Sequence, residues 1–370
     1  MNGLKEPTVL ENLYQTNHGR KAALCYITLP FANPNLGPTH PSLQTAMTMA
    51  RIMADKGFDI DVLHHMFVGD WDLSRYQVLL GFGYPFERSF NKPFAGKRIY
   101  FATGAATCQR NVAELERIQA FQRRHGVLYP PRRLKPYPDY ASSMLSDAIF
   151  CTGNGWTMQT YRAHFNGPIF RTPTHAHFTP NQQVLPRDYT QARTHFLWIG
   201  GAGLLLKGLD LCIEAFLNQE HVTLHVCCPM EERFLAVYAE ALKTTNRIKL
   251  YGFMDLASPA FAQLLAQCGY VLFPSASEAG ASSCLDAMAH GLVPVVTEQA
   301  SVDVQGAGFI LPDTSVQTIA THVGHLANLD PNHLQMRAQA SFEKVNKHHR
   351  LEHFSQAFAQ AWDAVVRPDM

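Results

Sequence analysis

The feature that most constrains the fold is an alternation of apolar, strand-like runs with amphipathic helical patterns, which occurs twice along the 370 residues. Alternation of this kind is typical of βα units built around a parallel sheet. The first series has a predicted helix over 42–57 and predicted strands over 21–30, 58–65, 77–85, 97–104 and 147–153. The second has predicted helices over 209–219, 231–245 and 259–269, and predicted strands over 194–201, 222–229, 248–253, 270–276 and 293–298. The sequence therefore predicts an α/β protein with two doubly wound, Rossmann-like domains.

The segment between the two series has the composition of a linker. Residues 171–193 are rich in Pro, Thr and His and show weak periodicity, whereas the stretch from about 316 to 366 has a helical pattern. A chain of this length also exceeds the usual size of one domain. We therefore predict an N-terminal domain over 1–180, a C-terminal domain over 181–345, and a helix over 346–370 that packs back on the first domain.

The charge balance argues against a nucleic-acid-binding protein. A net charge of +1 and a pI near 7.7 give no whole-chain field that would hold the protein on a polyanion. Residues 97–135 are the exception, with nine basic residues against two acids. This segment predicts either a contact with an anionic acceptor or membrane surface, or simply a solvated helix face. Nothing in the sequence indicates an oligomeric state.

The location of the protein is predicted from its cysteines and its apolar runs. Eight cysteines are scattered along the chain, which has no secretory-type apolar segment near its start and no run of 18 apolar residues. We expect reduced thiols and a cytoplasmic protein, peripheral at the inner face of the membrane if 97–135 binds lipid.

The segment 271–300 has the strongest chemical signal. A predicted strand is followed by a loop of small residues and then by a helix, so that backbone N–H groups can approach an anion closely. Glu278 opens this loop and Asp286 follows eight residues later. The two carboxylates could bind hydroxyls at either end of a nucleotide sugar. Alternatively, Ser283 and Asp286 form a near capping box with a structural role alone.

A second glycine loop, GGAGLLLKG, follows the predicted strand at 194–201. It includes Gly200 and Gly201 and ends near Lys207, a cation suited to a departing diphosphate. The loop is neither a dinucleotide fingerprint, because Leu206 replaces the third glycine, nor a P-loop, because no Gly-Lys-Ser/Thr is present. A metal centre is disfavoured, since the 18 histidines show no zinc-type spacing.

These motifs resemble those of glycosyltransferase family 4 and related retaining GT-B enzymes (glycosyl transferases group 1). The resemblance is strongest for the acid pair Glu-x7-Glu followed by "AMAxGxPVV", which is matched here by Glu278, Asp286, Ala287, Met288, Ala289, Gly291, Pro294, Val295 and Val296. It implies the GT-B fold, with two Rossmann-like domains facing a central cleft. It also implies that Glu278 lies near the donor sugar, Asp286 near the ribose and Lys207 near the leaving diphosphate. The backbone amides that would face the diphosphate are those of Gly280, Ala281, Ser282 and Ser283.

The chain departs from the family pattern at two positions. The second acid is Asp286 rather than Glu, and Gly201 stands where the family usually has an arginine soon after the strand. Either another basic residue compensates for that arginine or the diphosphate is stabilised less strongly. In the first domain, Gly37 between a strand and a helix is similar to the family's N-terminal glycine loop.

The implied activity is retaining transfer of a sugar from a nucleotide-diphosphate sugar to a glycan or lipid-linked acceptor, without a metal ion or other cofactor. Such an enzyme would serve bacterial surface polysaccharide or glycolipid synthesis. Two alternatives stay open at this point. One is a GT-B enzyme that epimerises or phosphorolyses nucleotide sugars, and the other is an inactive homologue that only binds them.

Overall fold

The computed structural model describes residues 6–33, 41–135, 139–179 and 182–366. The chain divides into two compact units, which are described separately. The first unit combines 1–107, 135–175 and 350–370, and the second combines 108–134 and 176–349. In the described part of the chain, no helix has the length and apolar character needed to span a bilayer.

The first unit is built on a seven-stranded sheet with the order β1-β3-β2-β4-β5-β6-β7. Its neighbours are parallel except for β1, which runs antiparallel to β3. The strands are β1 (Val9–Leu10), β2 (Lys21–Tyr26), β3 (Asp59–His64), β4 (Val78–Gly81), β5 (Lys97–Ala102), β6 (Ala148–Cys151) and β7 (Ile169–Arg171). Almost every residue of the central strands is buried, as expected for a parallel sheet covered on both faces.

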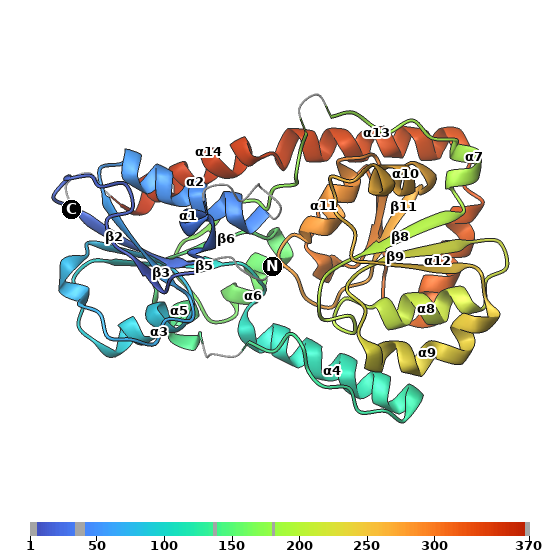
Figure 1. Cartoon of the computed structure of the whole chain (residues 1–370), viewed down its shortest axis with the longest axis horizontal. Helices are drawn as coiled ribbons and strands as arrows, with labels where there is room; N and C mark the ends of the chain where they lie inside the picture. The colour runs from blue at the N-terminus through green and yellow to red at the C-terminus, as the bar shows by residue number, and fades with distance from the viewer. Residues whose placement is uncertain (1–5, 34–40, 136–138, 180–181, 367–370) are drawn as a thin grey trace. The chain divides into compact units, whose positions relative to one another are not determined.

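Helices cover both faces of this sheet (Figure 1). They are α1 (Leu29–Ala32), α2 (Pro41–Asp55), α3 (Tyr84–Arg88), α5 (Tyr140–Leu145), α6 (Gly155–Arg162) and α14 (Leu351–Val365), with the short 3-10 turns η1 (Leu73–Arg75) and η2 (Ser89–Asn91). Helices α2 and α14 share one apolar core with the sheet. In that core Trp362 of α14 meets Phe58 edge to face, with ring centroids 5.5 Å apart. The C-terminal helix is thus part of the first unit.

The second unit contains a six-stranded parallel sheet with the order β10-β9-β8-β11-β12-β13. Its strands are β8 (His195–Ile199), β9 (Thr223–Cys227), β10 (Ile248–Gly252), β11 (Tyr270–Phe273), β12 (Val293–Val296) and β13 (Phe309–Ile310). Its helical elements are α7 (Tyr189–Ala192), α8 (Leu209–Leu217), α9 (Glu232–Thr244), α10 (Pro259–Gln267), α11 (Ser282–Met288), η3 (Glu298–Ala300), α12 (Val316–Ala327) and α13 (Pro331–His348).

The strand order of the second unit creates a switch point beside its first strand. The chain moves outward from β8 through β9 and β10, and then returns to β11 on the other side of β8. Loops that leave β8 and β11 therefore diverge from the same edge of the sheet. Ligands of open α/β sheets bind at such a point, outside the carboxyl ends of the strands. The two glycine-containing loops predicted to hold phosphate follow these two strands.

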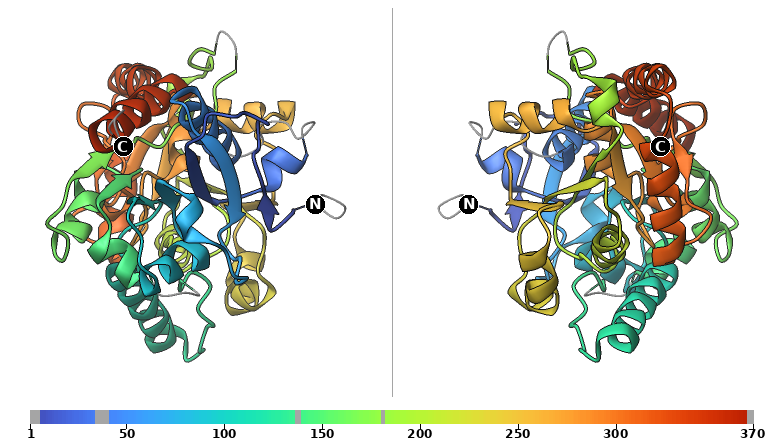
Figure 2. Two further views of the ribbon diagram at one scale, coloured as in Figure 1. Left: turned by 90° about the vertical axis from the view of Figure 1, so that its left-hand side faces the viewer. Right: turned by 90° about the vertical axis from the view of Figure 1, so that its right-hand side faces the viewer.

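Helix α4 (Thr107–His125) starts in the first unit, but residues 108–134 belong to the second, whereas the predicted N-terminal domain covered all of 1–180. The reason is an apolar face on α4 that packs into the core of the second unit. Phe121 stacks on Phe234 of α9, with ring centroids 6.3 Å apart. Figure 2 shows α4 in teal at the lower edge of both views, and Arg124 on this helix pairs with Asp210 of α8.

Candidate active site

Two loops meet at the switch point of the second unit. The first connects β8 to α8 and contains Gly200, Gly201 and Lys207, and the second connects β11 to α11 and contains Glu278. The Ala276 N–H donates to the carbonyl of Leu206 at 2.9 Å, which fastens one loop to the other. Gly208 turns the chain into α8 with φ of +75°, and a Cβ there would stand 2.6 Å from the Pro274 carbonyl oxygen. Only glycine fits that turn.

The structure brings the two predicted catalytic residues into direct contact. Lys207 Nζ forms an ion pair with Glu278 Oε1, and both side chains are largely buried, with 11% and 13% of their surface exposed. The Lys207 ammonium also lies over the ring of Phe273, 5.1 Å from its centroid. These contacts hold the cation at the carboxyl end of β11 instead of leaving it mobile in solvent.

The electrostatics around this pair indicate a surplus of positive charge. Burial lowers the pKa of Lys207, Glu278 opposes this shift, and Arg133 and Arg110 add to it, so that the pKa lies below its ordinary value. Burial works to raise the pKa of Glu278, but Lys207 and then the same arginines outweigh it, so the pKa lies below its ordinary value. Both shifts have the sign expected near three cations and one anion. Such a site favours a further anion.

The loop after β11 leads its backbone into α11 without a side-chain cap. Gly280 has φ of +73° and Ala281 is the N-cap residue, which makes no side-chain capping bond. Ser282 and Ser283 are half-buried in the first turn, and the Ser283 hydroxyl donates to the Ile199 carbonyl at 3.1 Å. The capping-box interpretation of Ser283 and Asp286 is therefore wrong. The serine hydroxyl instead ties α11 to the end of β8.

Asp286 is buried on α11 and accepts a hydrogen bond from the backbone N–H of His177, at 2.8 Å. His177 belongs to the stretch predicted as a linker, in which the described residues 172–179 and 182–188 contain no helix or strand. Burial raises the pKa of Asp286 to about 7, and the His177 N–H opposes this only in part. Asp286 thus helps to hold the chain that follows the first unit, while its contact with a ribose stays a prediction.

The raised pKa of Asp286 predicts a pH-dependent gain in stability for the Asp286→Asn variant. Between its ordinary value of 3.8 and about 7 the folded state binds the proton more tightly than the unfolded state, so this group's contribution to stability falls as pH rises through that range. Asparagine keeps the acceptor for His177 and does not titrate. We expect the variant to melt at higher temperature than wild type at pH 8, and the difference to shrink toward pH 5.

A matched control for this experiment is Asp255→Asn. Asp255 is an exposed carboxylate that likewise accepts a backbone N–H, that of Ala257 at 3.0 Å. Melting temperatures from pH 5 to 8 for wild type and both variants make the comparison. A constant difference between Asp286→Asn and wild type across this range would contradict the assignment of a buried, titrating Asp286.

The remaining predicted glycines fall in different environments. A Cβ on Gly200 would stand 3.0 Å from the Trp198 ring and 3.3 Å from Lys207 Cδ, so the loop leaves little room there. Gly201 is exposed and has open space around it. Gly37 lies outside the described residues, and its assignment stays a prediction.

Residues from the segment 108–134 contact both loops, which the sequence did not predict. Gln109 accepts from the Ser277 hydroxyl at 2.7 Å and donates to the Ala276 carbonyl at 3.3 Å. Arg117 is buried and donates to the Pro274 carbonyl at 2.7 Å. The side chain of Arg133 packs against Gly203 in the loop after β8. The only sequence signal for these contacts was the concentration of basic residues over 97–135.

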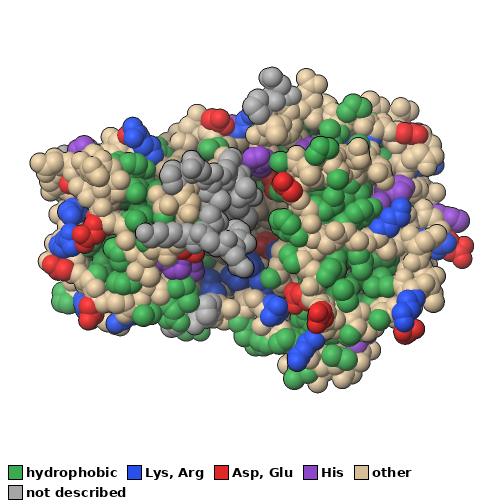
Figure 3. Space-filling view, viewed as in Figure 1, with side chains coloured by type: hydrophobic (Ala, Val, Ile, Leu, Met, Phe, Trp, Pro, Cys, Tyr) green, Lys and Arg blue, Asp and Glu red, His purple; other side chains and the backbone are tan. Residues whose placement is uncertain are grey.

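Most basic residues of 97–135 contact acidic or aromatic side chains of the unit to which each belongs. The pairs are Lys97 with Asp147, Arg98 with Phe90 and Phe94, Arg124 with Asp210 and Glu214, Arg132 with Glu231, and Lys135 with Asp139. On the face drawn in Figure 3, Lys and Arg side chains are interspersed with Asp and Glu. These pairings leave less charge for a membrane surface than the sequence suggested, and membrane contact stays a prediction.

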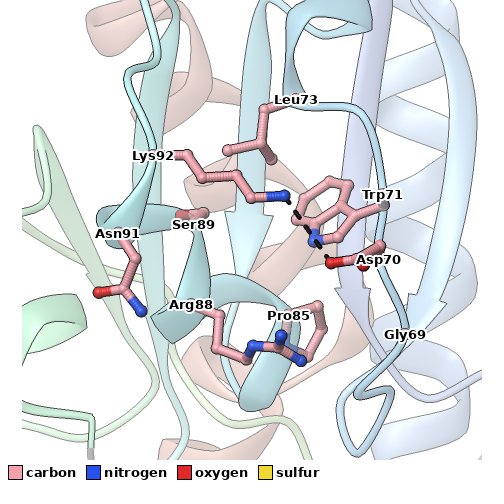
Figure 4. A pocket seen from close by; sticks show the side chains of 9 residues that line it. All are labelled: Gly69, Asp70, Trp71, Leu73, Pro85, Arg88, Ser89, Asn91 and Lys92. Carbon is pink, nitrogen blue, oxygen red and sulfur yellow. Dashed lines mark ion pairs between the residues drawn. The ribbon is translucent and has the colours of Figure 1, made fainter.

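A small cavity of about 80 Å³ lies in the first unit, away from these loops in the chain. Figure 4 shows Lys92 reaching past Trp71 toward Asp70, with 3.9 Å between the charged atoms. The cavity is smaller than the several hundred Å³ usual for ligand sites. It is therefore no candidate for a nucleotide sugar. Among the residues that the structure describes, no three His, Cys, Asp or Glu side chains are grouped as metal ligands would be.

Residues 193–328 match the family model of glycosyl transferases group 1. The matched range runs from the end of α7 to just beyond α12 and contains both loops and the Lys207–Glu278 pair. Among curated proteins, none matches the chain in sequence. The resemblance to glycosyl transferases group 1 is thus confirmed over the part of the chain in which its motifs lie.

Solved glycosyltransferase structures share the fold of the whole chain. The sucrose-phosphate synthase from Thermosynechococcus elongatus is 12% identical, with a TM-score of 0.64 over 93% of this chain and 98% of that one. WaaG, a glycosyltransferase involved in lipopolysaccharide biosynthesis, is 15% identical, with a TM-score of 0.57 over 94% and 100%. TarM is 12% identical, with a TM-score of 0.55 over 78% of this chain. The match covers 54% of TarM, so this chain spans about half of TarM's length.

At these identities the solved structures establish the fold, and the fold is GT-B, as the sequence predicted. The two parallel-sheet units described above are the two Rossmann-like halves of that architecture. Residues 193–328 are thus similar to glycosyl transferases group 1, and the chain has the GT-B fold of solved glycosyltransferases.

Proposed function

We propose that the protein is a retaining glycosyltransferase that moves a sugar from a nucleotide-diphosphate sugar to a glycan or lipid-linked acceptor. The observation that carries this proposal is the buried Lys207–Glu278 pair, which sits at the switch point within an excess of positive charge. Transfer places negative charge on the departing diphosphate. Fixed cations and backbone amides stabilise such charge without reorganising during the reaction.

The positions of the site residues support the following roles in the proposal. Lys207 neutralises the leaving diphosphate, and the backbone from Gly280 to Ser283 offers N–H groups to its oxygens. Glu278 holds Lys207 in place and accepts hydroxyls of the donor sugar. Asp286 binds the ribose with the carboxylate oxygen that His177 leaves available. A phosphate oxygen of the donor takes the proton of the acceptor hydroxyl as the nucleotide departs.

Related folds support the choice of substrates. A solved structure of Anabaena HepE is a complex with UDP and glucose; HepE is 12% identical, with a TM-score of 0.56 over 94% of this chain and 100% of its own. A mutant of TarM was solved with UDP and alpha-GlcNAc-glycerol. WaaG acts in lipopolysaccharide biosynthesis. We therefore propose a nucleotide-sugar donor and a role in bacterial surface polysaccharide or glycolipid synthesis, in the cytoplasm or at the inner face of the membrane.

A panel of nucleotide sugars tests the proposal. We expect at least one of them to raise the melting temperature, because a ligand that binds only the folded state stabilises it. The same compound should be hydrolysed slowly to nucleotide and a sugar of unchanged anomeric configuration, as followed by NMR. Inversion of the anomeric centre would refute retention. Reversible isomerisation of the sugar would favour an epimerase, and binding without turnover an inactive homologue.

Turnover is expected to be independent of divalent metal. The proposed charge stabilisation comes from Lys207 and backbone amides, so removal of metal ions should not affect it. We expect nucleotide release in excess EDTA to proceed at the same rate as in untreated enzyme and as with added magnesium. Complete loss of activity in EDTA, restored by manganese, would overturn this part of the mechanism.

A further inference from the structure

Arg133 packs on the loop that follows β8, against Gly203, which has no side chain. A Cβ placed on Gly203 would stand 2.2 Å from Arg133 Cγ and 2.8 Å from its Cδ, so any other residue would displace the arginine. Gly203 also has φ of +89°, a conformation that side-chain-bearing residues rarely adopt. The β8–α8 loop is therefore shaped to admit the arginine stem.

The backbone of Arg133 is held in place from α4. Glu114 on that helix is 2% exposed, and its Oε1 accepts the N–H groups of Arg132 at 2.7 Å and Arg133 at 3.0 Å. The helix is in turn fixed to the end of β11 by the bond from Arg117 to the Pro274 carbonyl. Arg133 is thus positioned by both the β8 and the β11 sides of the site.

The guanidinium retains hydrogen-bonding capacity that the described residues do not use. Arg133 Nε is buried and meets no hydrogen-bond acceptor in the described part of the chain. A buried donor without an acceptor is unfavourable, and an anion beside it would remove that cost. Arg133 acts on the charges of both Lys207 and Glu278, which places it in the same electrostatic neighbourhood as the ion pair.

We propose that Arg133 is the second side-chain cation of the diphosphate site, delivered by the segment 108–134 through the space that Gly203 leaves open. This inference rests on the proposed function. Gly201 stands where the family usually has an arginine, and two explanations were open: compensation by another basic residue, or weaker stabilisation of the diphosphate. The inference favours compensation. The arginine reaches the diphosphate from the stretch that follows α4, 62 residues before the first residue of β8, His195.

Titration calorimetry with UDP, GDP and ADP tests the inference on the full-length protein. The nucleotide that binds wild type most tightly is compared across variants. Arg133→Met removes the charge but keeps an unbranched stem, and we expect it to weaken binding at least about tenfold. Arg133→Lys keeps the charge and loses the planar fork, so it should recover part of the affinity. Arg123→Met is the matched control, because Arg123 is an exposed residue of the same segment 108–134.

The outcomes separate this inference from the function on which it rests. Weakened binding by Arg133→Met, with wild-type affinity in Arg123→Met and an unchanged melting temperature without ligand, supports the inference. Equal affinities in wild type and Arg133→Met overturn it and leave the proposed function standing. Failure of wild type to bind any of the three nucleotides overturns both. If Arg133→Met does not fold, Arg133→Gln gives the same comparison with the hydrogen-bonding capacity kept.

Discussion

Replacing Lys207 with methionine is expected to slow sugar transfer at least about tenfold, which corresponds to roughly 1.4 kcal/mol of additional barrier or more. Methionine keeps most of the unbranched stem of the side chain, but it removes the ammonium over Phe273 and with it the charge proposed to neutralise the leaving diphosphate. Glu278→Gln should reduce transfer by a similar factor, because the amide cannot hold the ammonium as an ion pair. The measurement is nucleotide release under saturating donor, with the nucleotide sugar that stabilises wild type.

Stability must be measured alongside these rates, since the pair is buried. Breaking a buried ion pair leaves one charge uncompensated and commonly costs about 3–5 kcal/mol. Arg133 and Arg110 reduce that cost for a lone Glu278, because both already favour its anionic form. Lys243→Met is the control for the chemical change, since Lys243 on α9 is 69% exposed and pairs only at the surface with Glu240. Transfer near the wild-type rate in both Lys207→Met and Glu278→Gln would contradict the assignment of this pair to the active site.

The second large effect is expected from Trp362→Ala, which should destabilise the first unit by about 3–5 kcal/mol. Trp362 is 1% exposed and fills the space between α14 and the sheet, where it meets Phe58 and Phe358. Truncation to alanine removes those contacts and leaves a cavity. Gln360→Ala on the exposed face of the same helix serves as the control.

Denaturant unfolding measures the loss of stability caused by Trp362→Ala, and hydrogen exchange shows in which unit it occurs. We expect protection to fall in β2 and β4 of the first unit and to remain in β8 and β11 of the second. An overall change below about 0.5 kcal/mol, the range of a surface substitution, would contradict the description of α14 as part of the first unit's core. Equal loss of protection in both units would do so as well.

Local patterns in the sequence predicted the elements and the central pair of the site. The strands β2, β4, β8 and β11 are short apolar runs with clear ends, and each was predicted within a few residues. Lys207 and Glu278 could be paired in advance because each follows a strand by a short loop, and because the strand order of a doubly wound sheet places such loops together. That reasoning needs only nearby residues and a general rule of topology.

The contributions of residues distant in the chain could not be predicted in the same way. Arg133 reaches the β8 loop because α4 packs on α8 and α9, and no periodicity in 97–135 distinguishes that packing from a helix on the first unit. The spacing of Ser283 and Asp286 alone was compatible with a capping box. Its true partner, His177, precedes it by 109 residues. Tertiary contacts overrode local preference at both positions.

The path of the chain has a practical consequence for obtaining either half in isolation. It leaves one compact unit for the other after residues 107, 134, 175 and 349. A fragment that begins at the predicted linker, near residue 171, would lack 108–134. Phe234, on which Phe121 stacks, would then be exposed, and exposed apolar surface promotes aggregation. An expression fragment of the second unit therefore needs α4 supplied, either in trans as a peptide or grafted through a circular permutation.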